Sequence, residues 1–90
     1  MQADKKQINR LLKTAYGQLE GIMRMVEDDR YCIDISNQIL ATEAVLRRAN
    51  KEILKAHMKS CVKNAIAEGG GDDKINEVIE ILDKISKWLF

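Results

Sequence analysis

The segment from Cys32 to Ala67 contains no glycine and no proline over 36 residues. Within it, apolar or small side chains recur at alternating steps of four and three, the period of a helix that packs lengthwise against a partner. These positions are Ile35, Ile39, Thr42, Leu46, Ala49, Ile53 and Ala56. The pattern predicts one unbroken helix over residues 32–67, around which the rest of the chain is organised.

Shorter helices are predicted on both sides of this long one. Residues 4–28 show similar apolar spacing, and a turn near Asp28 to Tyr31 separates them from the long helix. The glycines of "EGGGDD" end the long helix, and residues 74–89 form a third amphipathic helix. Because the chain has no proline and few β-branched clusters, we expect an all-α fold in a single domain over residues 1–90.

The length and composition of the chain limit its class. It has 90 residues and 46% hydrophobic content, without the run of about 20 apolar residues that a membrane helix needs. No apolar stretch follows the charged first residues, so we expect a cytoplasmic protein whose two cysteines are thiols. A chain this short buries only about 60% of its unfolded surface, which favours oligomerisation.

His57 and Cys61 lie four residues apart, so both project from one face of the predicted long helix. Cys32 lies 25 positions before His57, which is about 37 Å along an unbroken helix. The three residues can share a metal ion only if two copies of the helix pair antiparallel, with facing positions summing to about 91 and the two-fold axis near Val45 and Leu46. Two thiolates and an imidazole form a soft, low-coordinate set that suits Cu(I).

Each of these residues taken alone has a simpler explanation. Free cysteine is among the most buried residue types, and a single histidine is more often a partly buried polar residue than a ligand. Only the combined spacing favours a metal site.

The chain resembles the copper-sensing repressors of the CsoR/RcnR family in three segments: "GQLEGI", "DRYCIDISNQI" and "LRRANKEILKAHMKSC". The resemblance covers residues 8–87, and its specific part is the cysteine followed by His-x-x-x-Cys. It implies a dimer whose antiparallel helices form a four-helix bundle, two dimers in a disc-shaped tetramer, and Cu(I) bound by Cys32, His57 and Cys61 across protomers. It also implies that Tyr31 and Glu77 form hydrogen bonds around the histidine.

The charges of the chain are segregated. From Glu20 to Glu43 six acidic residues accompany two arginines, whereas from Ala44 to Ala67 six basic residues accompany one glutamate. Such a basic surface can meet an anionic partner, although a solvated helix face gives the same pattern.

The resemblance implies that this partner is operator DNA, bound by the apo-protein and released when Cu(I) binds, which would derepress genes of copper efflux or homeostasis. The expected DNA contacts are Arg10, Lys13, Gln18, Arg47, Arg48 and Lys51. Relatives often carry a basic residue where this chain has Leu11 and Tyr16, and Arg10 lies about 100° around the helix from Leu11.

Other functions are compatible with parts of the pattern. A redox-sensing repressor would join Cys32 to the Cys61 of a second copy through a disulfide or polysulfide, and it would not need His57. A helical scaffold or interaction module would use neither cysteine. We do not expect an enzyme, because no phosphate-binding glycine loop or oxyanion site accompanies the cysteine and the histidine.

Overall fold

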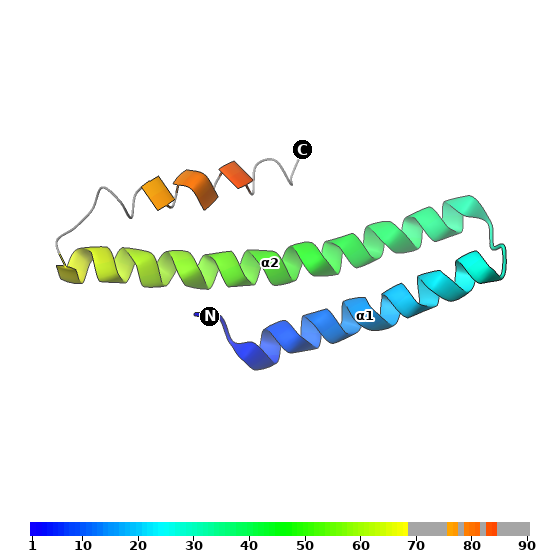
Figure 1. Cartoon of the computed structure of the whole chain (residues 1–90), viewed down its shortest axis with the longest axis horizontal. Helices are drawn as coiled ribbons and strands as arrows, with labels where there is room; N and C mark the ends of the chain where they lie inside the picture. The colour runs from blue at the N-terminus through cyan, green and yellow to red at the C-terminus, as the bar shows by residue number, and fades with distance from the viewer. Residues whose placement is uncertain (69–75, 78, 82, 85–90) are drawn as a thin grey trace.

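The computed structural model describes residues 1–68, 76–77, 79–81 and 83–84. Two long helices, α1 (Lys5–Glu27) and α2 (Cys32–Glu68), form an antiparallel hairpin, and the described residues contain no strand. The described residues between 76 and 84 are helical and lie beside the C-terminal half of α2, on the side away from α1 (Figure 1). The predicted all-α class is confirmed, while residues 74–75, 78, 82 and 85–89 of the third predicted helix lie outside the described part.

Local capping explains where α1 begins and ends. The side chain of Asp4 accepts a hydrogen bond from the backbone N–H of Lys6, which satisfies one of the free donors of the first turn. At the other end, the Arg30 N–H donates to the Met25 carbonyl and the Asp29 N–H donates to the Val26 carbonyl. This pair of bonds is a Schellman motif, in which the residue after the cap adopts a left-handed conformation. Asp29 occupies that position, with φ 51°.

The helix α2 continues without interruption from Cys32 to Glu68, as the absence of glycine and proline predicts. Its first turn contains Asp34, whose negative charge is favourable at a helix N-terminus. Cys32 and His57 therefore lie at opposite ends of one continuous rod, about 37 Å apart by helical rise. Neither described helix has the length and apolar character that a membrane crossing would require.

The core between α1 and α2 is thin. From α1 it contains Ile8, Ala15 and Ile22, which are spaced by seven residues, and from α2 it contains Thr42 and Ala49. The Thr42 hydroxyl donates to Gln18 Oε1 over 3.0 Å and so links the two helices. Large apolar side chains remain on the outside of the hairpin: Leu12, Tyr16, Leu19, Met23, Val26, Ile39, Leu40 and Leu46. A single chain thus leaves uncovered much of the apolar surface that its helical spacing predicts to be buried.

Candidate metal centre

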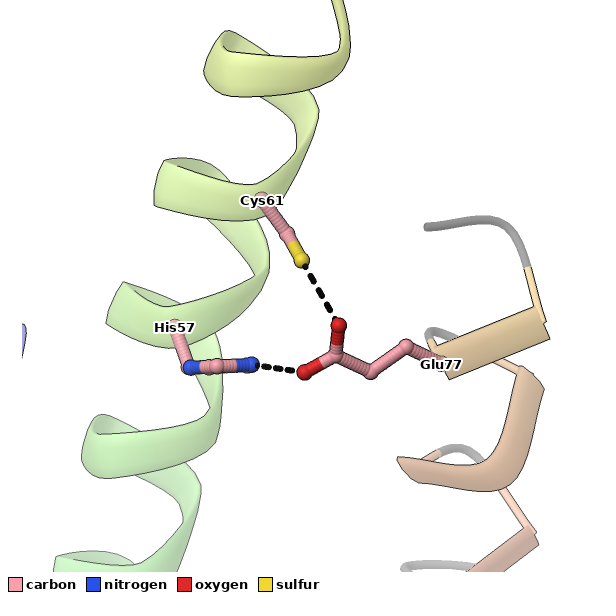
Figure 2. Close-up of polar contacts among 3 residues, drawn as sticks. All are labelled: His57, Cys61 and Glu77. Carbon is pink, nitrogen blue, oxygen red and sulfur yellow. Dashed lines mark hydrogen bonds and ion pairs between the residues drawn. The ribbon is translucent and has the colours of Figure 1, made fainter. Parts of the chain in front are cut away.

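His57 and Cys61 lie on one face of α2, one turn apart, and both point toward the third helical segment (Figure 2). The i, i+4 spacing produces this alignment, since side chains four residues apart are neighbours on a helix surface. The Cys61 thiol is buried, with 4% of the residue exposed, whereas the His57 side chain is 42% exposed. The pair therefore offers one sheltered sulfur and one accessible imidazole.

Glu77 completes this cluster from the third helical segment. Its Oε1 lies 2.6 Å from His57 Nε2, and its Oε2 accepts a hydrogen bond from Cys61 Sγ over 3.4 Å (Figure 2). The ligand atoms of the three residues all lie within 4.8 Å of one another. One carboxylate thus contacts both metal-capable side chains.

The contact with Glu77 also determines which histidine nitrogen can bind a metal. An ionised carboxylate only accepts hydrogen bonds, so a neutral imidazole in this contact carries its proton on Nε2. The lone pair of Nδ1 is then free for ligation. Holding the second ring nitrogen of a ligating histidine on a carboxylate is a common feature of metal sites.

Cys32 and Tyr31 lie far from this cluster. Cys32 is exposed at the start of α2, and the backbone carbonyl of Tyr31 accepts the N–H of Ile35. The Tyr31 side chain is exposed and forms no hydrogen bond with the described residues. Within one chain, the structure therefore brings together two of the three predicted ligands, and Glu77 with them, but neither Cys32 nor Tyr31.

Sequence reasoning missed two features of this region. The Glu77 contact with the thiol was not predicted, and neither was the position of the N-terminal residues. Met1 and Gln2 line a pocket of about 520 Å³ together with His57, Glu77 and residues that follow Glu77. No periodic signal in residues 1–3 could have revealed this, because these residues precede α1.

The residues expected to contact DNA are distributed over several surfaces. Arg10 and Arg48 line one groove between α1 and α2, whereas Lys51 lines a separate hollow on α2. Lys13 and Arg47 are exposed. Gln18 is half-buried, and its amide oxygen is engaged by Thr42.

Comparison with known proteins identifies the family. A family model described as "Metal-sensitive transcriptional repressor" matches residues 4–84. The chain belongs to this family. Its members are transcriptional repressors, which agrees with the expectation that the chain is not an enzyme and implies that it binds DNA.

The relatives include sensors of different metals. The copper-sensing transcriptional repressor CsoR of Bacillus subtilis is 40% identical over 84 residues, which is 93% of this chain and 83% of that protein. The crystal structure of the copper-sensing repressor CsoR with Cu(I) from Geobacillus thermodenitrificans superposes with a TM-score of 0.80 and 37% identity, over 96% of this chain and 93% of that one. The nickel-responsive transcriptional regulator InrS gives a TM-score of 0.84 and 29% identity, over 94% of this chain and 96% of that one. The resemblance to CsoR/RcnR repressors is confirmed, but the shared fold alone does not distinguish copper from nickel.

Proposed function

We propose that this repressor responds to Cu(I): the apo-protein binds operator DNA, and Cu(I) binding releases it, which derepresses genes of copper efflux or homeostasis. The observation that carries the proposal is the arrangement of His57 and Cys61 on one face of α2, with Glu77 holding Nε2 of the imidazole. The copper-sensing relatives support the same metal, since they are more similar in sequence than the nickel-responsive one.

The donor atoms of the proposed site fit Cu(I). Cys32, His57 and Cys61 would supply two thiolates and one imidazole, a soft set with few ligands. Nickel and cobalt usually need more nitrogen or oxygen donors, and zinc usually takes a fourth ligand. Glu77 acts in this proposal as a hydrogen-bond acceptor that orients His57, because a hard carboxylate oxygen is a poor partner for Cu(I).

The site would be shared between two protomers. Because α2 is continuous, Cys32 of one protomer can meet His57 and Cys61 only from its partner, in an antiparallel pair of α2 helices. Ile39 and Leu46, which are 43% and 45% exposed in the single chain, would be covered near the two-fold axis of that pair. The dimer would form a four-helix bundle, and two dimers would associate as a tetramer.

Charge supports the antiparallel direction. The start of α2 follows an acid-rich turn and has no basic residue before Arg47, whereas its C-terminal half carries four lysines, Lys51, Lys55, Lys59 and Lys63, against Glu52 and Glu68. In an antiparallel pair the acid-rich turn and start of each α2 lie beside the lysine-rich end of its partner, whereas a parallel pair would place the lysine-rich ends together. Opposite charges at such an interface favour the correct alignment of the two chains.

The proposed DNA contacts are Arg10, Lys13, Gln18, Arg47, Arg48 and Lys51. Lys and Arg side chains neutralise phosphates and displace counterions, so operator affinity should fall as salt rises. Bound Cu(I) would supply the bonds that join the two protomers at the site, while Tyr31 and Glu77 would stabilise the resulting subunit arrangement. By linkage, copper weakens DNA binding and DNA weakens copper binding by the same coupling free energy, commonly about 1 to 3 kcal/mol. Such a regulator would act in the cytoplasm as a single-domain protein.

Operator binding by anisotropy tests this function. The wild-type apo-protein first selects duplexes from a random DNA pool, and one selected duplex is then titrated anaerobically with and without buffered Cu(I). The Cys61→Ala variant should bind the duplex as wild type but resist release by Cu(I), whereas the adjacent Ser60→Ala variant should be released normally. Full release of Cys61→Ala by Cu(I) would remove the proposed site.

The same assay separates copper sensing from redox sensing. His57→Ala should lose the response to Cu(I), because one of the three proposed ligands is gone. If His57→Ala and wild type were both released by an organic polysulfide and neither by Cu(I), the redox-sensing alternative would replace the copper proposal.

A further inference from the structure

One protomer by itself brings three kinds of metal donor together at the end of α2. His57 offers an imidazole nitrogen, Cys61 a thiol sulfur and Glu77 a carboxylate oxygen, all within 4.8 Å of one another (Figure 2). The Cu(I) site proposed above uses only His57 and Cys61 of this cluster, takes Cys32 from the partner and leaves the Glu77 carboxylate outside the ligand set. The cluster therefore contains a second donor set, which needs no residue from another chain.

The chemistry of this second set is that of a zinc ligand shell. Zn(II) binds histidine nitrogen, cysteine sulfur and carboxylate oxygen alike, and three protein ligands with water in the fourth position are a usual zinc arrangement. Cu(I) is too soft to favour the carboxylate, while magnesium and calcium prefer oxygen ligands and do not favour a thiolate. A set with one sulfur, one nitrogen and one oxygen thus fits zinc better than any of these ions.

The distances within the cluster are close to those that a zinc ion requires. With the usual zinc bond lengths, the ligand atoms of a tetrahedron lie about 3.3 to 3.6 Å apart. Cys61 Sγ and Glu77 Oε2 are already 3.4 Å apart, and His57 Nε2 and Glu77 Oε1 are 2.6 Å apart. The second pair must open by less than about 1 Å to admit the ion. The side chains of His57 and Glu77 are 42% and 41% exposed, so both have room for this movement.

The surroundings of the cluster leave one side open to water. His57 and Glu77 line the pocket of about 520 Å³ that Met1 and Gln2 also line. Cys61 is buried on the other side, with 4% of the residue exposed. A water molecule from the pocket can therefore take the fourth position of a tetrahedral ion, while the buried sulfur holds the ion from within.

We propose that His57, Cys61 and Glu77 form a Zn(II) site within one protomer, with His57 Nε2, Cys61 Sγ, one Glu77 oxygen and a water as ligands. On binding, the Cys61 thiol releases its proton to solvent, and the neutral imidazole carries its remaining proton on Nδ1 instead of Nε2. The ion replaces the two hydrogen bonds that Glu77 accepts, so it joins the third helical segment to α2 of the same chain.

This zinc site has a consequence for regulation that rests on the proposed function. Zn(II) and Cu(I) compete, because both need His57 and Cys61. Zinc takes no ligand from the partner, so it makes no bond between protomers and leaves the repressor on its operator. The cluster would thus hold the harder ion in a form that does not induce.

Competition with a chromogenic zinc chelator tests the ligand set, and the same variants are titrated with Cu(I). Glu77→Gln should lower the Zn(II) affinity by more than about 100-fold, because it removes a direct ligand, whereas its Cu(I) affinity should fall much less, because the amide oxygen still accepts from His57 Nε2. Cys32→Ala should show the opposite pattern, with unchanged Zn(II) affinity and weak Cu(I) binding. Glu80→Gln, an exposed acid that lines the same pocket, is the control and should change neither affinity.

The single histidine of the chain gives a second readout. Ring-nitrogen NMR reports on His57 alone, so the nitrogen that binds each metal can be assigned without mutation. Zn(II) should bind Nε2 and leave the proton on Nδ1. Cu(I) should bind Nδ1 and leave the proton on Nε2, where Glu77 accepts it.

Several results would overturn the zinc site. Equal Zn(II) affinities of wild type and Glu77→Gln would exclude the carboxylate as a ligand, and zinc ligation through Nδ1 would exclude the proposed geometry. A loss of Zn(II) affinity in Cys32→Ala as large as that in Cys61→Ala would move zinc to a site shared between protomers. Release of wild type from the selected duplex by Zn(II) would refute the non-inducing mode. If wild type instead selected no DNA or ignored Cu(I), the proposed function would fail, while the zinc titrations would still decide the zinc site.

Discussion

The carboxylate of Glu77 lies 2.6 Å from His57 Nε2 and 3.4 Å from Cys61 Sγ, so one side chain from the third helical segment contacts both metal-capable residues of α2. The position of the third helical segment is therefore linked to whether the Cys61 thiol is protonated. Metal binding at the proposed Cu(I) site would remove the Cys61 thiol proton, and with it the hydrogen bond that Cys61 donates to Glu77. The contact with His57 would persist, because an imidazole that bound the metal through Nδ1 would keep its Nε2 proton on Glu77.

Replacing Glu77 should therefore weaken copper binding without abolishing it. Loss of a carboxylate that orients a ligating histidine typically costs about 10- to 100-fold in metal affinity, and we expect Glu77→Ala to fall in this range. Glu77→Gln should lose less, since the amide oxygen still accepts from Nε2. The measurement is an anaerobic competition between the protein and a chromogenic Cu(I) chelator. Asp83→Asn, an exposed acid in the same segment, is the control, and an unchanged affinity in Glu77→Ala would contradict the orienting role.

The turn between α1 and α2 contains a residue that is unfavourable for its conformation. Asp29 has φ 51° at the position of the Schellman motif where glycine is usual. Asp29→Gly should raise the free energy of unfolding by about 1 kcal/mol, because glycine has no Cβ to strain this region. Urea denaturation at fixed protein concentration measures the change. Asp28→Gly, at a position with φ −86°, should be slightly destabilising, and equal effects of the two substitutions would contradict the explanation.

The buried contact between Thr42 and Gln18 gives a third prediction. The single proton of the Thr42 hydroxyl is shared between two acceptors, Gln18 Oε1 at 3.0 Å and the Gln38 carbonyl at 3.1 Å. Thr42→Val keeps the shape but leaves Gln18 without this donor, so the free energy of unfolding should fall by about 1 kcal/mol. Thr14→Val removes only an exposed bond within α1 and should change it by less than about 0.5 kcal/mol. If the Thr42 variant matched the Thr14 variant, the interhelix bond would contribute no net stability.

The sequence was sufficient for the parts of the fold that depend on local chemistry. The long helix follows from the absence of breakers, and the start of α1 follows from the capping side chain of Asp4. The sequence predicted where the turn lies but not how it forms. The Schellman motif could not be recognised because Asp29 occupies the position where glycine is usual.

Contacts between distant segments were harder to predict. The spacing of His57 and Cys61 was visible, but their contact with Glu77 depends on how the third segment lies on α2. A similar limit applied to Arg10. One residue of separation places it about 100° from Leu11 on α1, yet a long guanidinium side chain reaches the same groove that Leu11 lines. Helical angle describes where a Cα lies, not how far a flexible side chain extends.

The proposed dimer predicts that Leu46 is critical for assembly. Leu46→Lys should place two like charges close together near the two-fold axis, while the single chain tolerates the change because Leu46 is 45% exposed. We expect a smaller particle in size-exclusion chromatography with light scattering. Ala44→Lys, about 200° around the same helix, should leave the assembly intact. A Leu46→Lys protein with the mass of the wild-type assembly would refute the proposed axis.

Mixing two defective variants tests whether the copper site is shared between protomers. Cys32→Ala and Cys61→Ala should each bind Cu(I) poorly, since every site then lacks one thiolate. In a mixed dimer, one site receives Cys32 from the Cys61→Ala chain and both His57 and Cys61 from the Cys32→Ala chain, while the other site lacks both sulfurs. Random exchange of equal amounts should therefore restore about one quarter of the wild-type capacity for tightly bound Cu(I).

Co-refolding of the two variants followed by chelator competition measures this capacity, with each variant refolded alone as the control. If the His57, Cys61 and Glu77 cluster of a single chain were the whole site, the Cu(I) capacities of the single and mixed variants would differ from this expectation. Cys32→Ala alone would then bind Cu(I) as tightly as wild type, and mixing would restore nothing beyond the contribution of that chain. Recovery that appears only after the chains exchange is the result that requires antiparallel α2 helices, because no other route brings Cys32 across the length of α2 to His57.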